Sequence, residues 1–335
     1  MASSAAAASA ESSGRGILAV ELGAEAAAWR LESCCEPDSL ALWGPVAQAA
    51  ERDAAAAPGH PLYSRLINLN MKAAAPGGYA IVMSQMSSGG APGPRPPAVA
   101  VGIVDSGYRG SLRAVVWAPG PAPAAGAGEP PAGLALRLTL ARLAPAPPRL
   151  VAAAADEDGA DAASGRATAG GAEVPFAAAF APKRDEDAGH DIAMPRAAVL
   201  APGESLRVRL PVAYAEGGLA GVPYVFGRSS CNLRGLVVLP TAWPAGAPCR
   251  FVLRNVTREP IAVAAGQRVA QLLLLARRLE WLPPGLNDGE PFPVSPRAAP
   301  PAPGAPRLRW RRVADLAAAA PASERGARGF GSTGL

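Results

Sequence analysis

The chain reads PLYSRLINLNMKAAAPGGYAIVMSQMSSGG at residues 61–90 and PGESLRVRLPVAYAEGGLAGVPYVFGRSSCNLRG at residues 202–235, and the two stretches follow the same plan. Each runs from a proline-led apolar strand, through a glycine-rich turn, to a tyrosine-containing strand and a pair of serines. Short strands separated by glycine and proline are typical of β-sandwiches and barrels. Recurrence of such a unit predicts a duplicated β domain.

The similarity continues downstream of both stretches. Residues 108–117 align with residues 245–254, and residues 131–143 align with residues 264–278. The offset between the copies stays near 133–143 residues. We therefore expect an all-β chain made of two similar domains, with chance similarity in a composition-biased chain as the alternative.

The composition is dominated by four residue types. Of 335 residues, 78 are alanine, 37 glycine, 37 proline and 30 arginine, against only two lysines. All four types have GC-rich codons, so the arginine excess indicates a property of the genome more than a functional signal. About 90 apolar residues other than alanine remain, enough for one or two compact domains together with long unpacked segments.

The same counts exclude several classes of protein. Two histidines and four cysteines without a C-x-x-C pair exclude an ordinary structural zinc site. Neither lysine is followed by serine or threonine, which excludes a Walker-type phosphate loop. The sequence shows no uncharged run of 18 apolar residues and no signal peptide, so we expect a soluble intracellular protein. A net charge of +5 permits an anionic ligand.

Low-complexity stretches predict the boundaries of the domains. The expected segments are a disordered N-terminus (1–14), an N-terminal β domain (15–150), a linker (151–172), a C-terminal β domain (173–280), a proline-rich linker (281–322) and a glycine-rich tail (323–335). The basic run RLRWRR at residues 307–312 is interpreted as solvated linker, with nuclear import or nucleic-acid contact as the alternative.

Polar residues that occur in only one copy are better candidates for chemistry than for folding. The first copy carries DSGYRG at residues 105–110, where the second has AWPAGA at residues 242–247. The second copy carries GRSS at residues 227–230, where the first has SQMS at residues 84–87. An acid and an aromatic residue thus lie in one half and phosphate-type donors in the other, which predicts a single site at the junction of the domains.

Five short motifs together resemble those of the deoxyuridine triphosphatases (dUTPases). They are GIVDSGYRG (102–110), AGHDI (188–192), GRSS (227–230), GQRVAQL (266–272) and RGARGFGSTG (325–334). The Asp/Tyr motif comes first in this chain, whereas it is the third motif of the ordinary homotrimeric enzymes. That order resembles the herpesviral branch, in which a doubled chain acts as a monomer with one active site. The resemblance covers about 250 residues and implies two dUTPase-like β-barrel or jelly-roll domains with a flexible C-terminal tail.

The resemblance implies hydrolysis of dUTP to dUMP and pyrophosphate by a water that attacks the α-phosphorus in line. Asp105 is then the residue that activates this water. Without the resemblance, Asp105 would be read as part of a hairpin turn, because Asp-x-Gly is good turn chemistry. Tyr108 is expected to stack on the deoxyribose and leave no room for a 2′-hydroxyl; the alternative is an ordinary strand aromatic.

The second half is expected to bind the phosphates. Arg228, Ser229 and Ser230 offer a guanidinium and two hydroxyls for phosphate oxygens, although GRSS alone would be read as a surface turn. Gln271 is expected to hold metal-bound water, the alternative being a polar residue on a strand of leucines. Asp191 resembles the acid that orients water on Mg²⁺, with the substrate phosphates as the direct ligands of the ion.

The tail would by composition alone be read as a disordered segment. The resemblance implies that it closes over the nucleotide and excludes bulk water. Arg325 is expected at the γ-phosphate and Phe330 on the uracil. Ser332 and Thr333 are expected on phosphate oxygens, with Gly331 permitting a close approach.

The sequence therefore predicts a magnesium-dependent dUTPase that is monomeric, resides in the host-cell nucleus or cytoplasm, and forms no stable complex with nucleic acid or membrane. The first alternative is a catalytically inactive duplicated β module that binds nucleotide or protein partners. The second, an arginine-rich nucleic-acid-binding protein, predicts basic residues interleaved with aromatics. It is poorly supported, because the 17 aromatic residues are spread thinly.

Overall fold

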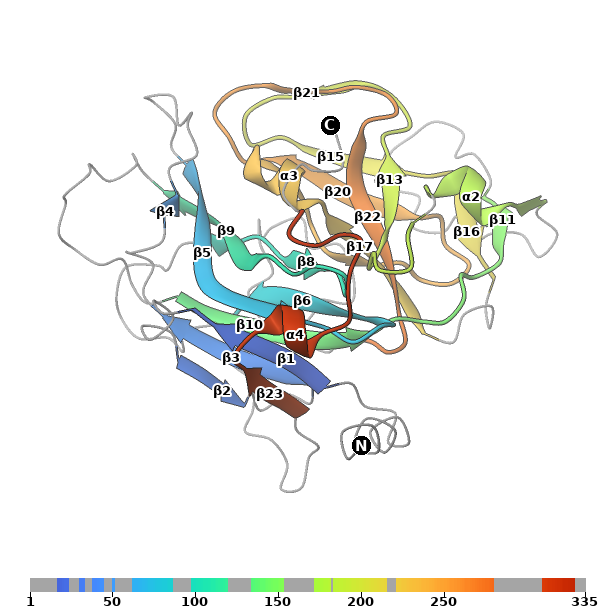
Figure 1. Cartoon of the computed structure of the whole chain (residues 1–335). Helices are drawn as coiled ribbons and strands as arrows, with labels where there is room; N and C mark the ends of the chain where they lie inside the picture. Colours follow the sequence, from blue (N-terminus) through green and yellow to red (C-terminus); the bar gives the residue numbers. More distant parts are fainter. Residues whose placement is uncertain are drawn as a thin grey trace.

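The computed structural model describes residues 17–23, 30–33, 38–44, 50–51, 62–86, 98–119, 134–153, 172–181, 183–215, 221–279 and 309–328. Within these ranges the chain forms mostly strands, with three short helices, α2 (Phe176–Ala179), α3 (Ser229–Leu233) and α4 (Leu316–Ala319). The all-β prediction is confirmed. Figure 1 shows two bodies of packed sheets side by side, one formed by blue to green strands and the other by yellow and orange strands.

The N-terminal half contains two sheets. One has the order β23 (Arg309–Val313), β1 (Ile17–Leu22), β5 (Leu62–Ala74), β9 (Ser111–Pro119), β7 (Ala98–Val99), with β4 (Ala50–Glu51) paired to β5. The other has the order β2 (Arg30–Ser33), β3 (Ser39–Gly44), β10 (Leu134–Arg142), β6 (Tyr79–Gln85), β8 (Gly102–Val104). Between them lies a core that includes Leu18, Ile67, Leu136 and Leu138. The alternation LALRLTL in β10 supplies every second residue to this core.

The C-terminal half contains two larger and two smaller sheets. The larger ones have the orders β13 (His190–Ala193), β22 (Arg268–Leu275), β17 (Val222–Gly227), β19 (Thr241–Ala242) and β15 (Ser205–Arg209), β20 (Arg250–Asn255), β18 (Leu236–Val238). The smaller ones are β12 (Glu173–Val174), β11 (Leu150–Ala152), β16 (Val212–Tyr214) and the pair β14 (Ala198–Leu200), β21 (Ile261–Val263). Their common core includes Ile192, Val225, Phe251 and Trp243.

The two halves have the same strand topology. The order β3-β10-β6-β8 corresponds to β13-β22-β17-β19, and β5-β9-β7 corresponds to β15-β20-β18. The corresponding strands also follow one another in the same order along the chain. Chance similarity of composition would not reproduce both orders, so the topology supports the duplication.

Apolar contacts join the halves. Ala80 and Val82 of β6 pack in one cluster with Tyr224 and Phe226 of β17. The run of leucines in β22 follows from this arrangement. Leu272 and Leu274 enter the core of the C-terminal half, whereas Leu273 and Leu275 enter the cluster between the halves. A strand buried on both faces has no polar alternation.

Two boundaries differ from the sequence interpretation. Strand β11 pairs with β16, so the C-terminal half begins at Leu150, ahead of the expected linker. The interpretation of residues 307–312 as solvated linker is wrong for the part that forms β23, because β23 pairs in parallel with β1. Trp310 packs against the N-terminal core. The chain therefore returns from the C-terminal half to the N-terminal sheet.

Helix α4 fixes the route of the chain after β23. Leu316 is buried against Ala19 and Ala74, and its backbone N–H donates to the Glu21 carboxylate at 2.7 Å. Glu21 also forms an ion pair with Lys72 at 2.8 Å. This docking directs residues 321–328 toward the junction of the two halves, as the red segment of Figure 1 shows.

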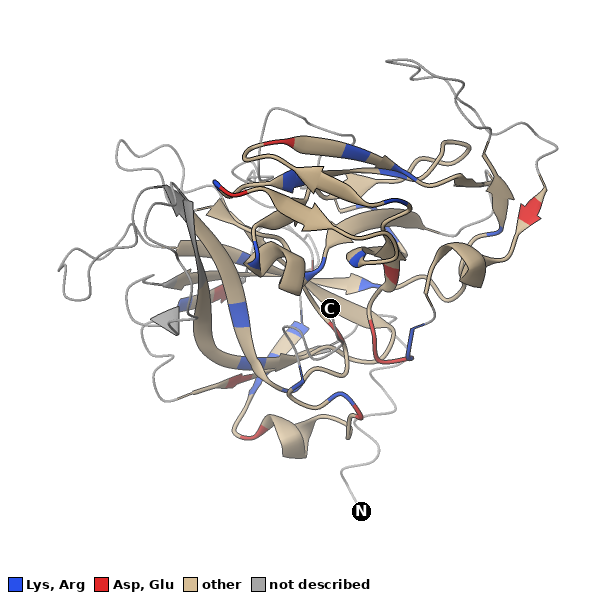
Figure 2. Ribbon diagram, turned by 90° about the horizontal axis from the view of Figure 1, so that it is seen from above, with Lys and Arg blue, Asp and Glu red and all other residues tan. Residues whose placement is uncertain are grey.

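Charged residues are distributed over both halves in Figure 2, with blue and red segments interspersed along the strands. No helix in the described ranges is long and apolar enough to cross a membrane.

Candidate active site

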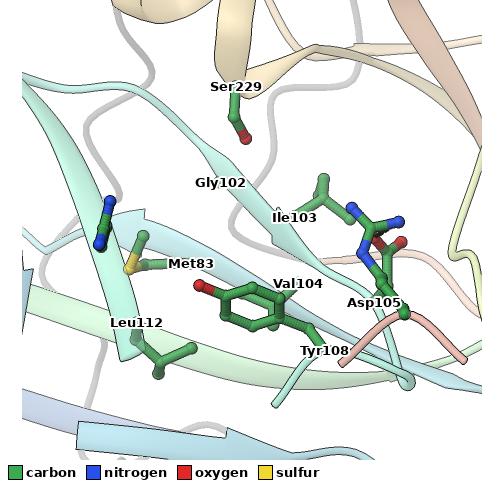
Figure 3. Close-up of a pocket in the computed structure, with 10 residues that line it drawn as sticks. Met83, Gly102, Ile103, Val104, Asp105, Tyr108, Leu112 and Ser229 are labelled. Atoms are coloured by element: carbon green, nitrogen blue, oxygen red, sulfur yellow. Dashed lines mark ion pairs between the residues drawn. The ribbon is translucent and has the colours of Figure 1, made fainter. Parts of the chain in front are cut away.

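A pocket lies where both halves and the tail meet. Its lining comes from β6, β8, β9 and the loop between β8 and β9 (residues 105–110) in the first half, from α3 in the second half, and from the tail. The lining residues are Met83, Gly102, Ile103, Val104, Asp105, Tyr108, Leu112, Arg113, Ser229 and Arg325. Figure 3 shows Ser229 reaching toward this space from the side opposite Tyr108. The predicted single site at the junction thus has a counterpart in one pocket.

Asp105 follows β8 directly and is 8% exposed. Its Oδ1 accepts a hydrogen bond from the backbone N–H of Ala188, in the second half, at 2.6 Å. Burial raises the pKa of the Asp105 carboxyl, although the Arg325 charge and the Ala188 hydrogen bond offset part of the rise. A buried carboxylate with a raised pKa is suited to accept a proton near neutral pH.

The Asp105–Tyr108 segment is also a turn, since the Tyr108 N–H donates to the Asp105 carbonyl at 3.1 Å. Asp105 therefore does begin a turn, but the turn is not that of a hairpin, because β8 pairs with β6 and β9 pairs with β5 and β7 in the other sheet. The Tyr108 hydroxyl donates to the Ser111 carbonyl at 2.9 Å, which leaves the ring to line the pocket. Gly110 permits this position, because a Cβ there would lie 2.5 Å from the hydroxyl oxygen.

Arg325 lies against Asp105 in this structure. Its Nη1 forms ion pairs of 2.8 Å with Asp105 Oδ2 and with Asp187 Oδ1. The position expected from the resemblance was at the γ-phosphate of a bound nucleotide. Burial opposes ionisation of Asp187, but hydrogen bonds from Arg184 outweigh it and lower the pKa of the Asp187 carboxyl. Arg325 is thus held between two carboxylates.

On the second half, Asp191 is bound by two guanidiniums. Arg228 Nε lies 2.9 Å from Asp191 Oδ1, and Arg268 Nη1 lies 3.1 Å from Oδ2. Arg228 also donates to the Arg268 carbonyl at 3.2 Å. It directly precedes α3, which places Ser229 at the pocket and Ser230 beside it.

Gln271 lies on β22, opposite Asp191 of β13 and opposite Phe226 of β17. Its Nε2 donates to the Gly227 carbonyl at 3.1 Å. A Cβ on Gly189 would lie 3.1 Å from Gln271 Oε1. Gln271 is therefore held beside the start of the GRSS motif.

The described residues contain no group of three or more His, Cys, Asp or Glu side chains that could hold a metal ion. Both Asp191 oxygens face arginine nitrogens. This donor set does not fit an ion held by protein ligands alone. An ion that takes its direct ligands from substrate oxygens is compatible with these side chains.

Four predicted site residues, Phe330, Gly331, Ser332 and Thr333, lie outside the described residues. Sequence reasoning missed Glu186 and Asp187, which contact the tail through their carboxylates. The available signal was the acidic run DED at residues 185–187, directly before the AGHDI motif.

Comparisons with known proteins identify the family of the chain. The dUTPase family model matches residues 176–282. The chain is 40% identical to the deoxyuridine 5′-triphosphate nucleotidohydrolase of equine herpesvirus 1 (strain Ab4p), over 82% of this chain and 84% of the relative. It is 42% identical to the protein of the same name from suid herpesvirus 1 (strain Kaplan), over 80% of each chain.

Among solved structures, the native EIAV dUTPase is similar, with a TM-score of 0.28 and 22% identity over 33% of this chain and 93% of that one. The two herpesviral relatives match along most of their own length and most of this chain. On these matches the chain belongs to the dUTPase family, in its herpesviral branch.

Proposed function

We propose that the chain hydrolyses dUTP to dUMP and pyrophosphate in one site shared by its two halves. The observation that carries the proposal is the common pocket of Asp105 and Tyr108 from the first half, Ser229 from the second and Arg325 from the tail. These four residues come from three of the dUTPase-like motifs, with Asp105 and Tyr108 in the same one. The product dUMP would supply thymidylate synthesis, and removal of dUTP would keep uracil out of DNA.

Asp105 is the proposed general base. Its carboxylate would take a proton from water while the water oxygen attacks the α-phosphorus and pyrophosphate leaves on the opposite side. Burial favours the proton-accepting reaction because it raises the pKa of the carboxyl. Arg325 must withdraw from Asp105 for the water to approach, and the negative charge of the triphosphate would attract it away.

The apolar wall of the pocket is the proposed nucleoside site. Ile103, Val104 and Leu112 give an apolar lining near the Tyr108 ring. The ring, fixed by its hydroxyl bond to Ser111, would pack on the deoxyribose and reject a 2′-hydroxyl. Rejection of UTP follows from this packing.

The second half is the proposed phosphate site. Arg228, Ser229 and Ser230 would donate to phosphate oxygens, because a guanidinium and hydroxyls are suited to them. Magnesium would be bound by the triphosphate and by waters on Asp191 and Gln271, and it would neutralise phosphate charge.

The tail is proposed to complete the site. Arg325 would move to the γ-phosphate, Phe330 would stack on the uracil, and Ser332 and Thr333 would donate to phosphate oxygens. Gly331 would allow the backbone to approach closely. The closed tail would exclude water other than the nucleophile.

One site built from two halves of the same chain needs no second copy. We therefore also propose a monomer, active in the nucleus or cytoplasm of the host cell. Size-exclusion chromatography with light scattering tests this: a mass near 33.7 kDa supports it, and a trimer contradicts it.

The direct test is pyrophosphate release by the full chain with dUTP, dTTP or UTP in the presence of magnesium. We expect release from dUTP alone, and loss of that release in Asp105→Asn. Absence of release by the folded chain contradicts the proposal, and nucleotide binding without release would favour the inactive module. Equal release from UTP would contradict the role of Tyr108.

A further inference from the structure

Glu186 is a carboxylate at the crossing of three segments of the chain. It lies in the loop before β13 and contacts the tail with both oxygens. Its Oε2 accepts from Ser323 Oγ at 3.0 Å and from the Arg325 N–H at 3.1 Å. Its Oε1 accepts from the Glu324 N–H at 3.1 Å. Three donors of the tail thus converge on one side chain.

The backbone of Glu186 contacts the loop 105–110, which carries Asp105 and Tyr108. Its carbonyl accepts from Ser106 Oγ at 3.2 Å and from the Gly107 N–H at 3.4 Å. Glu186, in a loop of the second half, therefore contacts both the loop 105–110 of the first half and the tail.

The fit around Glu186 is close. A Cβ on Gly107 would lie 2.4 Å from Glu186 Oε2 and 2.7 Å from its Cβ. Ser323 Oγ also donates to the Gly107 carbonyl. Further along the same loop, the Arg109 N–H donates to the Gly326 carbonyl at 2.8 Å. The tail is thus bound on two sides between Ser323 and Gly326.

Charge strengthens these contacts. Backbone N–H groups bond more strongly to an ionised acceptor than to a neutral one. The hydrogen bond from the Arg325 N–H lowers the pKa of the Glu186 carboxyl; burial opposes this, and the bonds from Ser323 and the Glu324 N–H add to the lowering. The side chain is therefore ionised when the tail is docked at neutral pH.

We propose that Glu186 is a positioning residue that docks the tail at Ser323–Gly326 and so holds Arg325 beside Asp105 and the pocket. Docking itself does not depend on the proposed function, whereas its effect on hydrolysis does. An anchored tail samples a small volume around the pocket, which raises its effective concentration there.

The first test measures docking without substrate. Hydrogen exchange of peptides covering residues 321–328 is compared between the full-length chain and Glu186→Gln. The amide keeps the size of the side chain but places an NH₂ group among the N–H donors of the tail. We expect faster exchange at Glu324 and Arg325 in the variant. Unchanged exchange overturns the proposal, whether or not the chain hydrolyses dUTP.

Glu324→Gln is the matched control. Glu324 is exposed and contributes its backbone N–H to the docking contact. This variant makes the same chemical change one residue from Arg325 and should leave tail exchange unchanged. Equal effects of both substitutions would show that net charge alone holds the tail, and would overturn the specific role of Glu186.

The second test is a double-mutant cycle on hydrolysis. In the full-length chain, Glu186→Gln should lower kcat/KM for dUTP roughly tenfold, the effect of losing bonds to a charged acceptor. In a chain ending at residue 322, the same substitution should change nothing further. An equal loss of kcat/KM in both chains would show that Glu186 acts on the loop 105–110 and not through the tail, and would contradict the proposal. Ser323→Ala, which removes one of the three donors, should give a smaller loss than Glu186→Gln.

Discussion

The two halves of the molecule share one strand topology but use the segment after one pair of corresponding strands differently. Asp105 directly follows β8 in the first half, and Trp243 directly follows the corresponding strand β19 in the second. Asp105 lines a pocket, whereas Trp243 is 1% exposed and packs against Phe180 and Tyr214. The Trp243 Nε1 donates to the Ala247 carbonyl at 2.8 Å. The segment after the strand thus supplies an acid to a pocket in one copy and an aromatic residue to the core in the other.

The difference is reversed at other positions. Strand β13 carries Asp191, whereas the corresponding strand β3, SLALWG, has no acid. After β17 the chain places Arg228 and Ser229 near the nucleotide site, whereas at the end of β6 the Gln85 side chain accepts from the Val99 N–H at 3.0 Å. Each copy therefore carries the part of a site that the other lacks. One pocket needs both copies.

The largest expected effect is that of Asp105→Asn. Loss of a general base should lower kcat by about 10²–10⁴-fold. Binding of a non-hydrolysable dUTP analogue should persist, because the amide has nearly the same volume. Steady-state kinetics and calorimetric binding measure the two quantities. A fall of less than about threefold in kcat would remove Asp105 from the chemistry.

Trp243→Ala tests the segment of the second half that follows β19, the strand corresponding to β8. The free energy of unfolding should fall by about 3–5 kcal/mol, the usual cost of deleting a large buried aromatic side chain. Urea denaturation measures it. Below the unfolding transition, KM for dUTP should stay as in the unmodified chain. A folded variant that no longer binds nucleotide would show that this loop of the second half belongs to the site.

Gly107→Ala tests the contact of the loop 105–110 with Glu186, which binds the tail. The new methyl group would displace the Glu186 side chain, and kcat/KM should fall by about tenfold, in line with the cost of overpacking. Gly246→Ala, in the corresponding loop of the second half, is the control. A Cβ there has no atom within 4 Å, although φ is +71°. It should cost about 1 kcal/mol of stability and leave kcat/KM unchanged. Equal effects of the two variants on kcat/KM would contradict the claim that only the loop of the first half contributes to the site.

The smallest expected effect is a shift in the pH dependence of kcat/KM. Only the carboxylate form of Asp105 accepts a proton, so kcat/KM should fall as the pH falls through its raised pKa, above the ordinary value of 3.8. The Arg325 charge lowers this pKa, so Arg325→Gln should move the acidic limb to higher pH. Arg328→Gln, on the exposed side of the tail, should not. An acidic limb that stays fixed or moves downward in Arg325→Gln would contradict the contact with Asp105.

The sequence was sufficient for the parts of the fold that have a local period. LALRLTL in β10 predicts a strand with one apolar face, and the order of the five motifs predicts a site shared by two copies. The pairing of β23 with β1 was missed, because RWRRV is short and rich in arginine and its partner lies almost a whole chain away. Edge strands commonly carry charge, so composition alone does not separate this strand from a linker.

The contacts of the tail could not be predicted for a similar reason. The ion pair of Arg325 with Asp105 and the bonds from the tail to Glu186 join residues distant in sequence, and neither leaves a periodic signal. Resemblance assigned Arg325 to a phosphate, which describes a bound state. In this structure its guanidinium lies instead between two carboxylates.

The central claim, one site assembled from both halves, is tested most directly by the stoichiometry of nucleotide binding. The full chain is titrated calorimetrically with α,β-imido-dUTP and magnesium, and its oligomeric state is measured in the same buffer. The account predicts one nucleotide bound per chain in a monomer. Two nucleotides per chain, or binding only in an oligomer, would contradict it.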